Sequence, residues 1–183
     1  MRRQRGFTLA ELLIVVAILA LLAGIGVPAM RELTLNNRQT GAVNELVAAL
    51  QLARSESITR NVNAPATVTV CSSNNGTSCG GTWANGWIVF TNDACDTSVP
   101  AADSVIRYTS GPAPAGETGF EVTATGFAIA AVCYRRTGRP TDNGDFVFCD
   151  DRGASDARVV QLGLGGRPTV SKKLSSGASP TCS

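Results

Sequence analysis

The first 30 residues divide between a short basic end and a long apolar run. Arg2, Arg3 and Arg5 precede the run, and no charged residue occurs from Leu12 to Met30. At about 1.5 Å of rise per residue, this run forms about 28 Å of helix, close to the ~30 Å hydrocarbon core of a bilayer. The pattern predicts a membrane-spanning half-helix over residues 7–30, with the basic end in the cytoplasm.

Two ordinary explanations of this N-terminus stay open on the pattern alone. In a secretory signal, a peptidase cuts at small residues after the apolar core, and "LLAG" near Ala23 offers such residues. In a plain signal anchor the segment is retained, and Glu11 is an interfacial carboxylate that reaches toward water. Neither explanation accounts for a carboxylate at the very start of the apolar run.

After Pro28 the periodicity becomes that of an amphipathic helix. Apolar residues recur at spacings of three and four over residues 31–60, and they are Val43, Leu46, Val47, Leu50, Ala53 and Ile58. One helix is therefore expected from Phe7 to about Arg60, with its second half covering a globular core. Gly24, Gly26 and Pro28 mark where this helix can bend or locally unwind.

From Asn61 onward the chain shows short runs typical of β-strands, separated by turn residues. The predicted strands are Ala66–Cys71, Trp87–Thr91, Ser104–Thr109, Gly119–Ala124, Ala128–Arg135, Asp145–Asp150, Ala157–Gly163 and Arg167–Lys172. Ser110–Gly119 is expected to be an exposed loop, and the tail after Lys173 to be flexible unless Cys182 anchors it. The fold class is therefore α+β, a long N-terminal helix packed on an antiparallel β domain.

All six cysteines follow the apolar segment, and the chain contains no histidine. They are Cys71, Cys79, Cys95, Cys133, Cys149 and Cys182. An even number of cysteines beyond a membrane segment indicates disulfides in an oxidising compartment, and a zinc site is disfavoured because neither a C-x-x-C pair nor an imidazole is present. The short loop between Cys71 and Cys79 favours that pairing, with Cys133, Cys149 and Cys182 bonded near the C-terminus.

The N-terminal stretch "RGFTLAELLIVVAILALLAGIGVPAM" resembles the class III leader of type IV pilins and type II secretion pseudopilins. The resemblance implies that a prepilin peptidase cuts after Gly6 and N-methylates Phe7. It also implies that Glu11 pairs with the new amine of a neighbouring subunit, and that Pro28 is the helix-bending proline. Residues 1–6 are then a leader, 7–30 the transmembrane half-helix, 31–60 its amphipathic half and 61–183 a periplasmic β domain.

Beyond the leader, the chain is similar to the GspH/FimT family of pseudopilins and minor pilins. The similarity is carried by "NNRQTGAVNELVAALQLARSESITRN", "VTVC", "WANGWIVF" and the pairs Gly138-Arg139 and Gly166-Arg167. It implies two small antiparallel sheets packed on the helix. It also implies an inner-membrane, single-pass filament subunit whose partners are other pilins or pseudopilins, the prepilin peptidase and N-methyltransferase, and the inner-membrane assembly platform.

Signs of catalysis are weak. Without histidine there is no Ser/His or Cys/His nucleophile, so we expect no enzyme activity, no catalytic residue, no cofactor and no metal site. The neighbouring carboxylates Asp142 with Asp145 and Asp150 with Asp151 lie in turn-like sequence and are expected to be solvated. Trp83 and Trp87 are expected to pack around a turn, with a surface-binding role as the alternative.

Charge allows one alternative function. The net charge of +2 becomes −1 once the three N-terminal arginines are removed, so overall charge indicates no nucleic-acid partner. The C-terminal third is basic, however, and some members of the similar family bind DNA through a Gly-Arg-x-Arg motif. Here Gly166-Arg167 lacks the second arginine, and Lys172 and Lys173 are the candidate substitutes, so a DNA-binding minor pilin for natural transformation is the alternative hypothesis.

Overall fold

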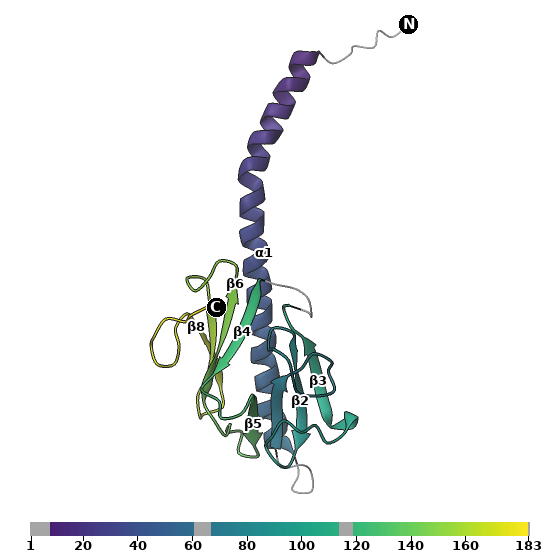
Figure 1. Ribbon diagram of the computed structural model, residues 1–183, viewed down its shortest axis with the longest axis vertical. Helices are drawn as coiled ribbons and strands as arrows, with labels where there is room; N and C mark the ends of the chain where they lie inside the picture. Colours follow the sequence, from purple (N-terminus) through teal and green to yellow (C-terminus); the bar gives the residue numbers. More distant parts are fainter. Residues whose placement is uncertain (1–7, 61–66, 114–118, 183) are drawn as a thin grey trace. The chain divides into compact units, whose positions relative to one another are not determined.

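The computed structural model describes residues 8–60, 67–113 and 119–182, and α1 extends from Leu9 to Thr59 as one unbroken helix (Figure 1). The chain divides into two compact units, the first ending at Asn37 and the second comprising Arg38–Ser183. The helix predicted to end near Arg60 is therefore observed, while its predicted start at Phe7 lies outside the described residues. The helix remains α-helical through Pro28.

In the second unit, α1 buries one face. The buried side chains recur at spacings of three and four, as the amphipathic pattern predicts, and they are Gln39, Ala42, Val43, Leu46, Ala49, Leu50, Ala53 and Ser57. Ile58 was predicted to belong to this face, and that prediction is wrong, because its side chain is 53% exposed. The helix ends one residue later, and Ser57 takes the inward position.

All eight predicted strands are present, with ends that differ from the predicted ones by at most three residues. They are β1 (Thr67–Ser72), β2 (Gly86–Asn92), β3 (Val105–Ser110), β4 (Phe120–Thr125), β5 (Ala131–Arg135), β6 (Gly144–Asp150), β7 (Arg158–Leu162) and β8 (Pro168–Ser171), with a 3₁₀ turn η1 (Ala102–Ser104) before β3. The largest shift is at β5, predicted from Ala128. The pairing of β5 with β1 ends at Cys71 and Ala131, so residues 128–130 lie outside this ladder.

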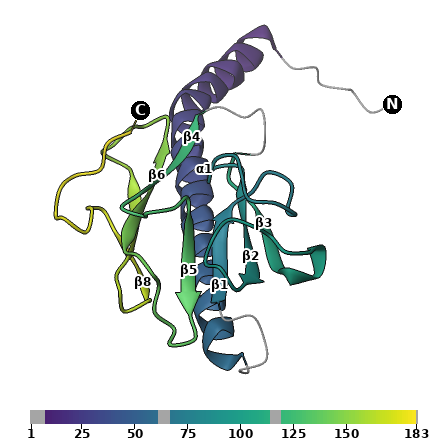
Figure 2. The same cartoon turned by 60° about the horizontal axis from the view of Figure 1, so that its bottom comes forward.

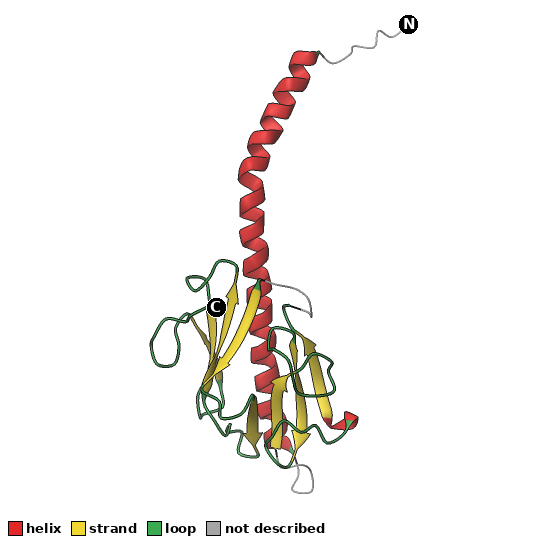
Figure 3. Ribbon diagram, in the orientation of Figure 1, coloured by secondary structure: helices red, strands yellow, loops and turns green. Residues whose placement is uncertain are grey.

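The strands form two antiparallel sheets of four strands each, in the orders β3-β2-β1-β5 and β4-β6-β7-β8 (Figure 3). Figure 2 shows the second half of α1 lying along both sheets. One core joins the three parts, with Leu46 and Leu50 from the helix, Val70 and Val89 from the first sheet, and Phe146 from the second. The predicted fold class, a long helix packed on two small antiparallel sheets, is confirmed.

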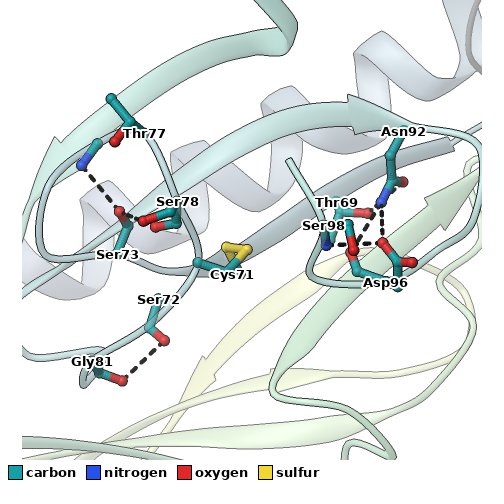
Figure 4. The surroundings of a disulfide bond; sticks show 12 residues. Thr69, Cys71, Ser72, Ser73, Thr77, Ser78, Gly81, Asn92, Asp96 and Ser98 are labelled. Carbon is teal, nitrogen blue, oxygen red and sulfur yellow. Dashed lines mark hydrogen bonds between the residues drawn. A yellow bond between two sulfur atoms is a disulfide. The ribbon is translucent and has the colours of Figure 1, made fainter. Parts of the chain in front are cut away.

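Three disulfides join the loops to the sheets. Cys71 bonds Cys79 across the β1–β2 loop, Cys95 bonds Cys133 of β5, and Cys149 of β6 bonds Cys182. Figure 4 shows the first bond beside a turn in which the Ser73 hydroxyl donates to the Ser78 carbonyl oxygen (2.7 Å). Each bond typically stabilises a domain by about 2–4 kcal/mol. The bond at Cys182 anchors the tail to β6.

The loop predicted to be exposed over Ser110–Gly119 is in part packed. Ala113 is buried, and the Pro112 carbonyl oxygen accepts hydrogen bonds from Nε (2.8 Å) and Nη2 of Arg38. The Arg38 guanidinium also lies over the Phe120 ring, 5.5 Å from its centroid. The prediction fails at Pro112 and Ala113 because a helix residue far away in sequence provides the donor, and residues 114–118 lie outside the described part.

Two of the carboxylates predicted to be solvated are buried instead. Asp145 accepts hydrogen bonds from the Ser175 backbone N–H (2.9 Å) and hydroxyl (2.8 Å). Asp150 accepts two from the Arg152 side chain, at 2.6 and 3.0 Å. These donors make burial tolerable, since buried carboxylates need partners. The hydrogen bond from the Arg152 guanidinium lowers the pKa of Asp150 below its ordinary value, against the opposing effect of burial.

This ion pair predicts a specific dependence of stability on pH. A lowered folded-state pKa contributes stability that is complete above the unfolded pKa of about 4 and is lost as the pH falls through the folded value. We expect Arg152→Met to reduce the free energy of unfolding by about 3 kcal/mol at neutral pH. As the pH falls from neutral toward 2 the deficit should shrink, because protonation of Asp150 removes the ion pair from the wild type as well.

Urea unfolding of the full chain in detergent, followed by tryptophan fluorescence, measures the free energy of unfolding at both pH values. Lys172→Met is the matched control, because it removes an exposed cation. An equal deficit at both pH values would contradict the assignment.

Candidate functional site

The first unit presents a long apolar surface that is exposed throughout its described residues. Every residue from Thr8 to Thr34 is exposed. The best 18-residue window of α1 has a mean hydropathy of 2.8 and no buried residue, and the helix is long and apolar enough to cross a membrane. An exposed apolar surface of this extent marks a site for lipid or protein partners.

Glu11 is held in the first turn of this helix by Thr8. The backbone N–H and the hydroxyl of Thr8 both donate to Oε2 of Glu11, at 2.8 and 2.9 Å. In return the Glu11 N–H donates to the Thr8 hydroxyl oxygen (3.3 Å). This reciprocal arrangement is a capping box, which satisfies backbone donors that a helix start otherwise leaves unpaired. Our sequence reasoning missed it, although Ser/Thr-x-x-Glu before an apolar run is its known signal.

The capping box orients the Glu11 carboxylate but uses only one of its two oxygens as an acceptor. Among the described residues, both side-chain bonds use Oε2, and no donor reaches Oε1. One oxygen therefore remains available to a cation brought by another molecule. Gly6 and Phe7, the predicted cleavage pair, lie outside the described residues.

Gly24, Gly26 and Pro28 lie together in the exposed half of α1. A Cβ placed on either glycine would meet nothing within 4 Å, so packing within the chain does not require glycine there. Pro28 lacks an N–H, which leaves the Gly24 carbonyl without its helical donor. Small residues of this kind allow another helix to approach closely.

The structure separates the three residues predicted as a DNA contact. Arg167 precedes β8 and lines a hollow of about 480 Å³ with Gln51, Arg54, Ser55, Ile58 and Pro168. Lys172 and Lys173 follow β8 and do not line this hollow; the Lys173 carbonyl oxygen instead accepts a hydrogen bond from Gln161 (2.7 Å). We call this cavity the Arg54–Arg167 hollow.

The two Gly-Arg pairs meet behind this hollow. Arg54 Nε donates to the Gly138 carbonyl oxygen (3.1 Å), and the Tyr134 hydroxyl donates to the Gly166 carbonyl oxygen (3.4 Å). Burial raises the pKa of Tyr134 well above its ordinary value, so its hydroxyl remains a donor at physiological pH. Both glycines have positive φ, 71° at Gly138 and 76° at Gly166, a conformation that favours glycine.

The two tryptophans considered as a binding surface lie in the protein core. Trp83 and Trp87 are buried, and the Trp83 ring packs edge-on against Phe146 with centroids 4.8 Å apart, so the surface-binding alternative is wrong. Within the described residues, no group of three or more metal-ligating side chains is present.

Comparison with known proteins identifies the family. The model of the family described as type II transport protein GspH matches residues 42–166, and the prokaryotic N-terminal methylation motif matches residues 1–27. The chain belongs to the GspH family. It also carries the N-terminal methylation motif of the minor pilin and pseudopilin families.

Relatives and solved structures agree with this family. A fimbrial protein of Pseudomonas aeruginosa is 47% identical over 58 residues, 32% of this chain and 37% of that protein. Fimbrial protein Q of Moraxella bovis is 46% identical over 48 residues, 26% and 31% of the two chains. The GspH-family chain therefore spans about a third of the length of these curated relatives.

The crystal structure of the type IV minor pilin FimU of Pseudomonas aeruginosa PAO1 superposes with a TM-score of 0.58 at 19% identity. The superposition covers 82% of this chain and 99% of FimU, and it shows a shared fold.

The capping box predicts a local effect of Thr8. We expect Thr8→Val to speed amide hydrogen exchange over residues 9–12 by about fivefold, because losing an N-cap costs about 1 kcal/mol. Exchange is measured by mass spectrometry on the full chain in detergent. Thr34→Val is the matched control, because its hydroxyl bonds the Met30 carbonyl oxygen in mid-helix (2.9 Å). Equal exchange in wild type and Thr8→Val would contradict the capping role.

Proposed function

We propose that this GspH-family chain is a minor pilin, a structural subunit incorporated into a type IV pilus through its N-terminal helix. The observation that carries the proposal is the uncovered apolar half of α1 with the oriented Glu11 carboxylate at its start. Before incorporation, residues 7–30 anchor the chain in the inner membrane and residues 61–183 form a periplasmic domain.

Processing creates the partner that Glu11 needs. Prepilin peptidase cuts between Gly6 and Phe7, removes the arginines of the leader, and leaves an N-methylated, positively charged amine on Phe7. A carboxylate in the membrane core costs about 3 kcal/mol or more, so it favours a cation in the same apolar surroundings. On assembly the other oxygen of Glu11 accepts a hydrogen bond from the Phe7 amine of a neighbouring subunit. The resulting ion pair sets the register between the two helices.

The methylation motif supports this order of events, because N-methylation takes place on an amine that a cut must first expose. The exposed Gly24, Gly26 and Pro28 support tight helix packing in the filament. The names of the relatives, fimbrial proteins and the minor pilin FimU, support a pilus over the type II secretion pseudopilus.

The Glu11 pair is tested by incorporation. We expect Glu11→Ala to be cut at Gly6–Phe7 as in the wild type, because the cut precedes pairing, yet to enter sheared filaments at least tenfold less. Mass spectrometry of the mature protein reports the cut and the methyl group, and immunoblots of sheared filaments report incorporation. Glu32→Ala, which removes another exposed acid of α1, is the matched control. Normal incorporation of Glu11→Ala would contradict the pairing, and a mature protein that starts at Met1 or beyond Leu22 would contradict the processing.

A clean deletion decides which machine uses the subunit. Twitching motility, uptake of labelled DNA and secretion of exoproteins are scored in the same strain. We expect motility to fall and to be restored by the gene in trans, with secretion unchanged throughout. Loss of secretion alone would place the subunit in the type II system, and loss of DNA uptake alone would support the DNA-binding alternative.

A further inference from the structure

The Arg54–Arg167 hollow lies between the last turns of α1 and the start of β8. Gln51, Arg54, Ser55 and Ile58 follow a helical spacing of three, four and seven residues, so they form one stripe of α1 beside its buried face. Arg167 and Pro168 line the hollow from the β8 side. All six residues belong to the second compact unit.

Two cations face this hollow with little neutralisation. Arg54 donates a hydrogen bond from Nε to the Gly138 carbonyl oxygen. Among the described residues, nothing accepts a hydrogen bond from its two terminal nitrogens. Within the same described part of the chain, the Arg167 guanidinium has neither a hydrogen bond nor an ion pair, and no acidic residue lines the hollow. Two guanidinium groups with free donors match the planar geometry of carboxylates.

The remaining lining is apolar or neutral. Ile58 leaves 53% of its surface exposed, a large value for a residue at the end of an amphipathic stripe, and Pro168 lies on the other wall. Gln51 and Ser55 add neutral hydrogen-bonding groups. The hollow therefore combines carboxylate-binding donors with an apolar contact for aliphatic side chains.

The Gly-Arg pairs are what hold this shape. A Cβ at Gly138 would collide with Ile58, and one at Gly166 would collide with the Gly138 backbone and crowd Arg54. Glycine at both positions lets the two backbone segments lie directly behind Arg54 and Ile58. The two glycines thus lie against two of the side chains that line the hollow.

We propose that the Arg54–Arg167 hollow is a docking site for an acidic peptide segment of a neighbouring filament subunit. The carboxylates bind Arg54 and Arg167, while an adjacent aliphatic side chain contacts Ile58 and Pro168. Charge complementarity carries the choice of occupant. The identity of the neighbour rests on the proposed function, whereas binding of an acidic peptide does not.

Nucleic acid fits the same hollow less well. Among the described residues that line it, none has an aromatic side chain to stack on bases, and a phosphate backbone makes no use of the Ile58 and Pro168 surface. Lys172 and Lys173, which would extend a track for phosphates, do not line it. The structure therefore favours a peptide carboxylate.

Peptide binding to the purified full chain in detergent tests the proposal. The probe is a fluorescein-labelled short peptide of alternating glutamate and valine, measured by fluorescence anisotropy. We expect Arg167→Gln to weaken its binding about tenfold, Arg54→Gln with Arg167→Gln to weaken it further, and higher salt to weaken it in the wild type. Ile58→Asp should also weaken binding, because it adds a negative charge to the apolar wall.

The matched control is Lys172→Gln with Lys173→Gln, which removes two positive charges outside the hollow and should leave binding within about twofold. A lysine–valine peptide should not bind. Because Arg54 also bonds Gly138, thermal unfolding is checked for each variant. Arg167→Gln alone keeps the test decisive, because the Arg167 side chain has no partner among the residues that the structure describes.

The proposal is overturned if the glutamate–valine peptide does not bind, or if Arg167→Gln binds it like the wild type. It is also overturned if a short single-stranded DNA binds through these arginines and the peptide does not displace it. This assay requires neither leader cleavage nor filament assembly, so its failure is distinct from a failure of the proposed pilin function.

Discussion

From Leu12 to Met30 the helix is apolar on every side and exposed throughout the described structure, and this constraint governs the rest of the molecule. Water disfavours such a surface, so it requires either lipid or the same surface of other subunits. A lone carboxylate at its start is tolerable only where a cation can reach it. Among the described residues, the Thr8 capping box uses only one Glu11 oxygen, and under the proposed function the other oxygen links the apolar helix to assembly.

The second half of α1 solves the opposite problem, because it buries its apolar face within the chain. Leu46 and Leu50 enter a core shared by both sheets. Arg38 lies at the start of this packed half, where its guanidinium binds the Pro112 carbonyl oxygen and lies over the Phe120 ring. One continuous helix thus provides an uncovered surface to partners and a covered one to its own domain. The three disulfides fasten loops of that domain, whose sheets have only four strands each.

The sequence predicted what local periodicity encodes and missed what distant residues decide. The helix and all eight strands could be read from spacing, and the bond between Cys71 and Cys79 follows from their closeness in the chain. The bond between Cys95 and Cys133 depends on how a loop meets β5, which no local pattern contains. Asp145 was predicted to be solvated because its hydrogen-bond donor, Ser175, lies thirty residues away in the sequence. The Arg54–Arg167 hollow was likewise invisible, since its two cations meet only in the fold.

Apolar contact alone cannot determine how subunits of this family are arranged. The hydrophobic effect has no direction, and lipid tails solvate leucine as well as another helix does. Apolar helices can therefore slide and rotate against one another. Direction must come from polar groups that are satisfied in one arrangement only. Under the proposed function, Glu11 provides one such constraint at the start of α1, and the paired arginines provide another at its end. Two separated polar contacts of this kind restrict both the axial position and the rotation of a subunit.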